Sequence, residues 1–326
     1  MDTPIDTQIY NGQRIIETLM RSTPEKSVLI CLFALALAII CIGGCLEEQA
    51  PVDVSGNNIF GNISNTDSTS SGKITIDSIG TFDYDPREIE TVRKDIFQPG
   101  HFSIFDILVY LDRRGDIEMA YHFDENMNTH VIDSIYGKMD WWYMAYYDGG
   151  WPEPNAFRMD LYPHKDDMYI RIIQDDASMI EGKYRAFFEE TKRKEQNGGK
   201  VIIPEVIIDG PTTNERFENS EVIAHDLRTD VFLPGTVTAM DVIMSLGDEG
   251  KLTYDLQWHD SIGSTGVVRT YFVDRINQDK SLFRCGFVYE AGSSQFRGSR
   301  GNHVHIPADT RVINSPEYEE WFWICI

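Results

Sequence analysis

Positive charge is scarce in this 326-residue chain. Its 29 Lys and Arg residues stand against 52 Asp and Glu residues, which gives a formal net charge of −23. Nucleic-acid binding requires clustered cations that neutralise phosphates, and the sequence contains no such cluster. An acidic surface also repels anionic lipid head groups. Nucleic acid is therefore not an expected partner, and any membrane attachment must be hydrophobic.

Motifs of catalysis and metal binding are also missing. The sequence contains no nucleophile elbow, zinc-protease helix, phosphate-binding loop or suitably ordered Cys–His pair. His303 and His305 would lie on one side of a strand, but no third ligand is evident nearby, which favours two solvated histidines. We predict no catalytic residue, no metal ligand and no cofactor, and a protein that is not an enzyme.

Cysteine is rare in the part of the chain that is expected to fold. Of five cysteines, three lie in or beside an N-terminal apolar run, and only Cys285 and Cys325 lie beyond it. Both occur in strand-like contexts, and in an oxidising exterior they would form one disulfide. The alternative is two small buried thiols, because the sequence does not give the Cα separation that a disulfide requires.

The apolar run is Ser27–Gly44, which contains eighteen residues without a charge. It is preceded by the cations Arg14, Arg21 and Lys26 and followed by Glu47 and Glu48. This bias predicts that the N-terminus stays inside and the remainder of the chain is exported. The length is at the lower limit for a transmembrane helix and long for the core of a signal peptide.

The end of this run, Ile42-Gly43-Gly44-Cys45, resembles the lipobox of prokaryotic lipoproteins. The resemblance implies cleavage of residues 1–44 and lipidation of Cys45. The 26 residues before the run are long for such a leader, so an uncleaved membrane anchor is the alternative. In both cases the domains are expected on the extracytoplasmic side of the cell membrane.

Residues 45–72 are rich in Asn, Ser, Thr and Gly, and they contain too little apolar surface to offset chain entropy. We expect a flexible tether there, with Asn62 as a candidate glycosylation site in the sequon Asn62-Ile63-Ser64.

An internal repeat organises the remaining residues. DIFQPGHFSIFDILVYLDRRG at 95–115 matches DVFLPGTVTAMDVIMSLGDEG at 230–250, with a constant offset of 135. Matched order over most of each half indicates two copies of one fold. The copies are expected at 73–175 and 199–326, with a helical connector at 176–198.

Matched aspartates accompany the repeat. Asp95 corresponds to Asp230, and Asp133 corresponds to Asp274. Repetition at equivalent positions favours capping or turn roles over acid–base chemistry.

Each copy is predicted to open with a strand, and a second strand is expected to end at Phe97 or Phe232, before a Pro-Gly turn. Alternating strands are expected to follow. The predicted strands are Lys73–Ile79, Ile117–Phe123, Trp141–Tyr147, Phe157–Tyr162 and Met168–Ile173 in copy one, and Lys200–Ile208, Leu252–Trp258, Val267–Asp274, Phe283–Tyr289 and Trp321–Ile326 in copy two.

A short helix is expected after each Pro-Gly turn. Ser103 lies three residues before Asp106, and Thr238 lies three residues before Asp241, which is the spacing of a capping box. A further helix is predicted over Ala177–Gln196 as the connector.

One helix packed on a mixed or antiparallel sheet is the β-grasp pattern, an α+β fold. Each copy resembles the β-grasp module that ends transcobalamin-type proteins and recurs in uncharacterised prokaryotic surface proteins. The matching features are the short capped helix, the strand and turn over 141–149 (WWYMAYYDG) and the Lys165-Asp166-Asp167 turn. The resemblance implies two tandem β-grasp-like domains and a corrinoid or another small molecule as a ligand.

A dense aromatic run marks the first copy, comprising Trp141, Trp142, Tyr143, Tyr146, Tyr147 and Trp151. Side chains on a strand alternate between faces, and one helix covers one face. The rings on the other face would suit a sugar, a corrinoid-like molecule or a protein partner, in an open groove. Alternatively, the second copy or the connector helix covers that face. The second copy lacks the run, so any site is expected to be single.

These observations predict a non-enzymatic binding protein anchored at the cell surface, with the aromatic strand as its site. Its expected partners are the membrane, through an N-terminal lipid or helix, and a small molecule or envelope component. The competing hypothesis is a structural or adhesive envelope protein, which would present a flat acidic surface without a pocket.

Overall fold

The computed structural model describes residues 72–146, 152–262, 265–298 and 306–325. The predicted N-terminal helix, the tether at 45–72, Cys45 and Asn62 lie outside these residues, apart from Gly72. Tyr147, Trp151, His303 and His305 also lie outside them.

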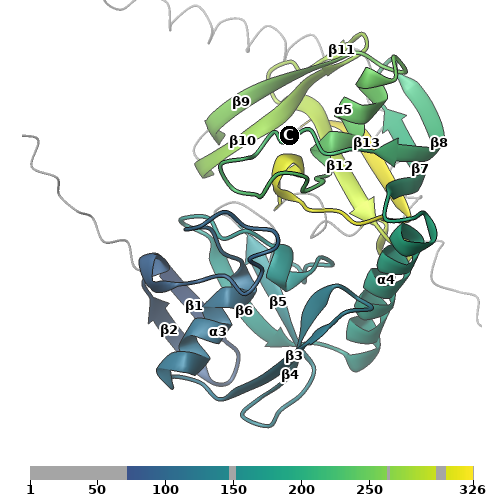
Figure 1. Ribbon diagram of the computed structural model, residues 1–326. Coiled ribbons are helices and arrows are strands. Elements are labelled where there is room, and N and C mark those ends of the chain that lie inside the picture. The colour runs from purple at the N-terminus through teal and green to yellow at the C-terminus, as the bar shows by residue number, and fades with distance from the viewer. Residues whose placement is uncertain (1–71, 147–151, 263–264, 299–305, 326) are drawn as a thin grey trace, which may run out of the picture. The chain divides into compact units, whose positions relative to one another are not determined.

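The described residues form a mixed α+β structure that contains two four-stranded sheets (Figure 1). The first sheet has the order β2-β1-β6-β5. Its strands are β1 (Gly72–Ile76), β2 (Gly80–Tyr84), β5 (Trp141–Tyr146) and β6 (Tyr169–Gln174). The two central strands, β1 and β6, run parallel, and each edge strand is antiparallel to its neighbour.

The second sheet repeats this arrangement in the order β8-β7-β13-β12. Its strands are β7 (Val201–Asp209), β8 (Asn214–Val222), β12 (Cys285–Gly292) and β13 (Tyr318–Cys325). The central pair, β7 and β13, is again parallel, and both edges are antiparallel. The two sheets therefore share one strand order and one pattern of directions, as two copies of one fold require.

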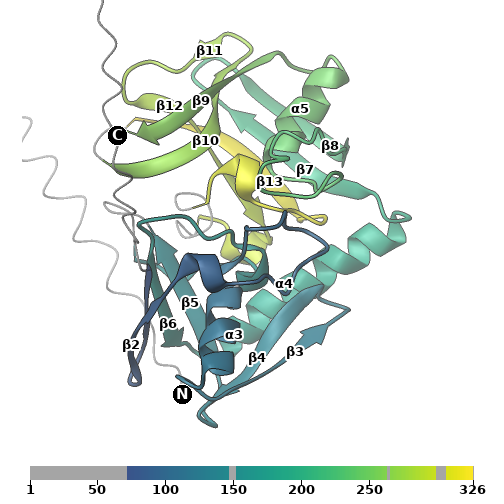
Figure 2. The ribbon, with the colours of Figure 1, turned by 60° about the vertical axis from the view of Figure 1, so that its left-hand side comes forward.

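Each sheet is accompanied by a separate hairpin, inserted after the helix. In the first half this is β3 (Met119–Asp124) with β4 (Thr129–Ile135), which runs beside α3 in Figure 2. In the second half β9 (Tyr254–Ile262) pairs with β10 (Thr265–Ile276), which also pairs with the short β11 (Asp279–Lys280). The strand β4 was not among the predicted strands.

The helices α3 (Ile104–Arg114) and α5 (Met240–Asp248) follow the Pro-Gly turns. The predicted capping box is present at α3, where the Ser103 amide donates to Asp106 Oδ2 at 2.7 Å and the Asp106 amide donates to Ser103 Oγ at 3.3 Å. At α5 the Thr238 amide donates to Asp241 Oδ2 at 2.6 Å, but Ala239 occupies the N-cap position.

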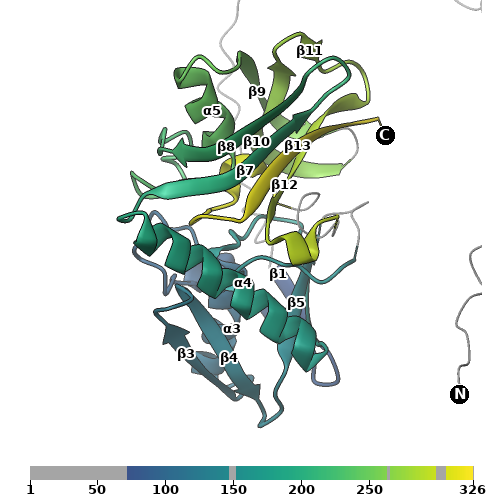
Figure 3. The same ribbon diagram turned by 90° about the vertical axis from the view of Figure 1, so that its right-hand side faces the viewer.

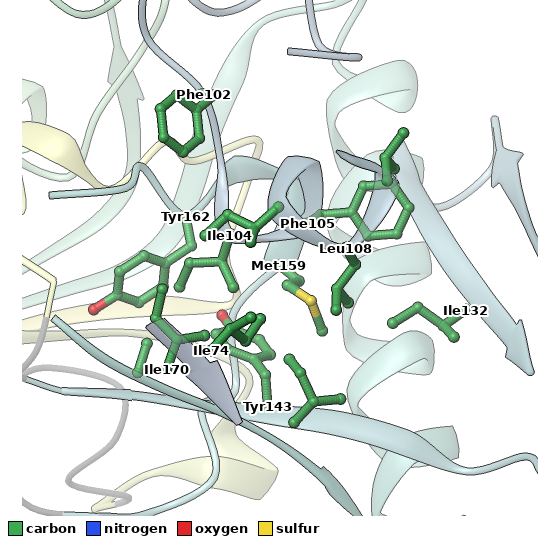
Figure 4. Packing of buried hydrophobic residues seen from close by; sticks show 14 of the residues in the cluster. Ile74, Phe102, Ile104, Phe105, Leu108, Ile132, Tyr143, Met159, Tyr162 and Ile170 are labelled. Carbon is green, nitrogen blue, oxygen red and sulfur yellow. The ribbon is translucent and has the colours of Figure 1, made fainter. Parts of the chain in front are cut away.

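The buried face of α3 packs against the first sheet. Figure 4 shows Ile104, Phe105 and Leu108 gathered with the strand residues Ile74 and Ile170. All of these side chains are almost completely excluded from solvent, so the helix and sheet share one hydrophobic core.

The connector α4 (Ala177–Gln196) has the bounds that the sequence predicts, and Figure 3 shows it along its full length, leading into β7. Its N-cap is Asp176, whose carboxylate accepts the Ser178 amide at 2.9 Å. Near its other end, Arg193 Nε donates to the carbonyl of Ser315 at 2.9 Å, which ties the helix to the second half.

The predicted strands that end at Phe97 and Phe232 are wrong. The strands β2 and β8 end ten or more residues earlier, and Phe97 instead forms an isolated antiparallel bridge with Phe232, with ring centroids 5.5 Å apart. Gln98 N donates to Val231 O at 2.9 Å, and Leu233 N donates to Ile96 O at 2.8 Å. Phe97 and Phe232 are buried because they join the two halves, not because they belong to strands.

The predicted strand at Phe157–Tyr162 is also wrong, because Met159–Leu161 form a short 3-10 helix. The residues of this 3-10 helix are buried because the helix packs on α3. Their burial does not reflect the alternation of a strand.

A buried ion network ties together separate segments of the first half. Arg93 binds Asp95 through two hydrogen bonds of 3.0 and 2.9 Å, and its Nη1 donates to Asp160 Oδ2 at 2.9 Å. Asp160 is completely buried and also accepts from Thr129 Oγ1 at 2.6 Å and from the His130 amide at 3.0 Å. Burial raises the pKa of Asp160, but the His130 hydrogen bond and the Arg93 charge outweigh it, so the net shift is downward.

The second half repeats the same network. Arg228 binds Asp230 through two hydrogen bonds of 2.8 Å and Asp309 through a third of 2.8 Å. Asp309 also accepts from the Thr270 hydroxyl and from the Tyr271 amide. Asp95 and Asp230 both lie in turns, as the sequence predicts, and in each copy the carboxylate also binds a guanidinium.

We predict that Asp160→Asn lowers the free energy of unfolding by about 3–5 kcal/mol, because it leaves the buried Arg93 with one partner fewer. Asp309→Asn should have a similar effect in the second half. The control is Asp83→Asn, which removes the exposed ion pair with Lys73 and should cost less than about 1 kcal/mol. Denaturant unfolding of the full-length chain in mild detergent measures these changes. Equal losses for Asp160→Asn and Asp83→Asn would contradict the prediction.

Candidate functional site

The aromatic strand β5 is largely buried. The relative exposures of Trp141, Trp142 and Tyr143 are 2%, 2% and 0%. Tyr143 lies in the core between α3 and the first sheet (Figure 4), and its hydroxyl donates to the carbonyl of Phe157 at 2.8 Å. The predicted open groove is therefore wrong for these three rings.

Trp142 lies on the opposite face of the sheet, where the connector helix α4 covers it. Its ring contacts Tyr184 and Phe187, with centroid distances of 5.6 and 6.3 Å, and Lys183 Nζ lies 4.6 Å from its centroid. Its indole nitrogen donates to the carbonyl of Asn155. This is the arrangement of the alternative interpretation, in which the connector helix covers the face.

Tyr146, at the end of β5, is the one predicted ligand-binding residue among those described that is not buried. It lies opposite Tyr169 of β6, and the two rings are nearly parallel, with centroids 5.3 Å apart and an interplanar angle of 17°. Tyr169 is 52% exposed. Tyr169 was not among the predicted site residues, although the polar and apolar alternation of β6 (YIRIIQ) places Tyr169 and Arg171 on the outer face.

The two tyrosines line a hollow of about 650 Å³, which we call the tyrosine hollow. Its wall comes from β1, β2, the end of β5, β6, the turn before β6 and Pro86 after β2. The lining residues are Gly72, Lys73, Thr75, Thr81, Tyr84, Pro86, Tyr146, His164, Asp166, Asp167, Met168, Tyr169, Ile170 and Arg171. Lys73, Thr75 and Arg171 alternate with the core residues of their strands and so lie on the outer face of the sheet.

Polar side chains around the hollow are held by neighbours. Lys73 Nζ lies 2.7 Å from Asp83 Oδ1, the Thr75 and Thr81 hydroxyls lie 3.0 Å apart, and Arg171 Nε lies 2.6 Å from Asp77 Oδ1. These contacts orient hydroxyl, ammonium, guanidinium and carboxylate groups beside two flat rings. The arrangement can stack an apolar face and bind hydroxyl groups with both donors and acceptors.

His164 forms part of the wall and is held from two sides. Its Nε2 lies 2.9 Å from the Tyr84 hydroxyl, and its ring stacks on Phe102 with centroids 4.7 Å apart. Burial lowers the pKa of His164 to about 4, against an opposing effect of Asp166. His164 is therefore neutral at physiological pH.

The two cysteines of the folded part form a disulfide bond. Cys285 and Cys325 are direct partners in the β12–β13 register, and their sulfurs are bonded. The pair lies in the second half and contributes nothing to the tyrosine hollow.

Within the described part of the chain, no group of three His, Cys, Asp or Glu side chains is arranged to hold a metal ion. Among the same residues, no helix is both long and apolar enough to cross a membrane. No protein-family model, curated protein or solved structure matches the chain.

We predict that acidification destabilises the protein partly through His164. Its folded-state pKa of about 4 lies below the unfolded value of about 6.5, so between these pH values the unfolded chain binds more protons. Stability should therefore fall as pH falls, by about 2 kcal/mol from this group between pH 7.5 and 5. In denaturant titrations over the same pH interval, the free energy of unfolding of His164→Gln should fall by about 2 kcal/mol less than that of the wild-type protein. Equal losses for both proteins would contradict a shielded histidine.

Proposed function

We propose that the chain is an exported, membrane-attached, non-enzymatic binding protein that holds a small molecule in the tyrosine hollow. The observation that carries the proposal is the Tyr146–Tyr169 pair, which lines the hollow on a sheet face whose other aromatic residue, Trp142, is covered by α4. A cavity of this size and mixed lining is typical of small-molecule sites.

The proposal includes two β-grasp-like domains. In each half an antiparallel pair leads to a helix, and the last strand runs parallel to the first between two antiparallel edges. This topology supports the β-grasp assignment and the likeness to the transcobalamin-type module, with the hairpins β3–β4 and β9–β10 as additions to the basic fold.

Membrane attachment is proposed from the sequence. The charge bias around Ser27–Gly44 and the lipobox-like Ile42–Cys45 support export and lipidation at Cys45. The Cys285–Cys325 disulfide supports an oxidising compartment, because disulfides persist mainly outside the cytosol.

A sugar is the ligand class that fits the hollow best. A pyranose ring has an apolar face that stacks on tyrosine, and its hydroxyls bind donors and acceptors such as those of Lys73, Thr75 and Asp166. A corrinoid, implied by the transcobalamin resemblance, is the second candidate. Its flat macrocycle suits the tyrosines, but only part of it would fit in about 650 Å³.

The attachment is tested by intact mass analysis of the mature chain, extracted from membranes of the native cell. We expect a lipid-modified N-terminus at Cys45, and alkylation of Cys285 and Cys325 only after reduction. An unmodified chain that begins at Met1 would contradict lipidation and would indicate an uncleaved membrane anchor instead. Alkylation of both cysteines without reductant would contradict the oxidising location.

The ligand site is tested by calorimetry and saturation-transfer NMR on the full-length chain in detergent, with neutral oligosaccharides and a corrinoid as probes. Tyr169→Ala should weaken binding about tenfold, because it removes one stacking surface. The control Tyr136→Ala removes an exposed tyrosine outside the hollow and should leave affinity unchanged. If no probe binds, or Tyr169→Ala binds normally, the structural or adhesive envelope role becomes the better explanation.

A further inference from the structure

A second cavity of about 550 Å³ lies where the two repeats meet, and we call it the inter-repeat cleft. The first repeat contributes the segment at 86–89, the Pro-Gly turn with His101 and Phe102, and the turn at 163–166. The second repeat contributes Arg228, Asp230 and Val231, Trp258 of β9, Arg269 of β10 and Thr310. Small-molecule sites occur preferentially at such domain interfaces.

Cations outnumber carboxylates in the lining of the cleft, although the chain as a whole has a net charge of −23. The four cationic residues are Arg87, Lys165, Arg228 and Arg269, and the two carboxylates are Asp166 and Asp230. Asp230 already binds Arg228 through both of its oxygens. Burial lowers the pKa of Lys165 to about 8, so its ammonium group is still mostly protonated at neutral pH.

Two local features of the cleft lower the stability of the fold. His101 has a buried Nδ1 without a hydrogen-bond partner in the described structure. Arg269 has a φ of 42° inside an irregular part of the β9–β10 ladder, between Val267 and Thr270. Irregularities of this kind redirect side chains and are common beside binding sites.

The cleft and the tyrosine hollow share a wall. Pro86, His164 and Asp166 line both cavities, so the two cavities lie next to each other. An exposed ring also stands in the cleft, because Trp258 is 39% exposed and Arg228 lies 5.4 Å from its centroid. Flat rings are therefore available on both sides of the shared wall.

We propose that the hollow and the cleft together bind one acidic oligosaccharide, with a sugar ring on Tyr146 and Tyr169 and a carboxylate of a neighbouring sugar among the cations of the cleft. In this proposal Lys165 and Arg269 contact the carboxylate. Arg228 is already bound to Asp230 and Asp309, and it contributes only long-range electrostatic attraction. A guanidinium matches the two oxygens of a carboxylate, and a charge-assisted hydrogen bond is about twice as strong as a neutral one. This inference rests on the proposed function and adds the charge of its ligand.

The decisive comparison uses oligogalacturonic acid and its fully methyl-esterified form, which differ in charge and share the same sugar chain. Calorimetry on the full-length chain in detergent, at fixed physiological ionic strength, should show about tenfold tighter binding of the acid. The difference should shrink as salt is added, because added ions screen the attraction.

Variants assign this preference to the cleft. The double variant Lys165→Gln with Arg269→Gln should abolish the tighter binding of the acid, so that the acid and the ester bind with equal affinity. The matched control is Lys94→Gln with Lys200→Gln, which removes two exposed cations outside both cavities and should keep the preference. Circular dichroism confirms that each variant is folded.

The outcomes separate the two proposals. If the ester and the acid bind equally to the wild-type chain, the anionic subsite is wrong and the proposed sugar site stands. If neither binds, the proposed function itself is wrong. If the acid binds more tightly but both double variants lose the preference alike, the attraction comes from overall charge and the cleft is not the subsite.

Discussion

The buried arginine–aspartate pairs hold the described part of the chain together. Asp160 and Asp309 are each completely buried, and each joins an arginine from the loop before the Pro-Gly turn to backbone and hydroxyl groups of the inserted hairpin. A buried charge is tolerated only where partners surround it, so these segments must assemble in one arrangement. In the second repeat the same arginine, Arg228, also lines the inter-repeat cleft. The buried ion pair that stabilises the second repeat therefore also positions one lining residue of the proposed site.

Local chemistry made part of this fold predictable. The capping box of Ser103 and Asp106, the left-handed Gly115 that ends α3, and the bounds of α4 all depend on neighbouring residues in the chain. The duplicated order of elements was also visible, because the two copies preserve their turns at a constant offset.

Long-range packing was not predictable in the same way. Nothing near Phe97 distinguishes an apolar residue in a strand from one that meets Phe232 of the other repeat. The order Arg-x-Asp occurs before each Pro-Gly turn, but the buried partners of the two arginines, Asp160 and Asp309, lie 67 and 81 residues further along the chain. The site followed the same rule. Trp142 and Tyr146 lie on one outer face, and only the position of α4 decides which of them is covered.

The contact between Phe97 and Phe232 has a consequence for the origin of the duplication. The two hydrogen bonds beside it are reciprocal, since Gln98 corresponds to Leu233 and Ile96 corresponds to Val231 at the repeat offset of 135. Each repeat thus offers the same donor and the same acceptor to the other, which is the arrangement that two identical subunits adopt about a two-fold axis. A single ancestral repeat would carry both halves of this contact and could pair with its own copy. In these terms the chain is built like a covalently linked dimer whose halves differ, since one carries the paired tyrosines and the other contributes Trp258 and Arg269.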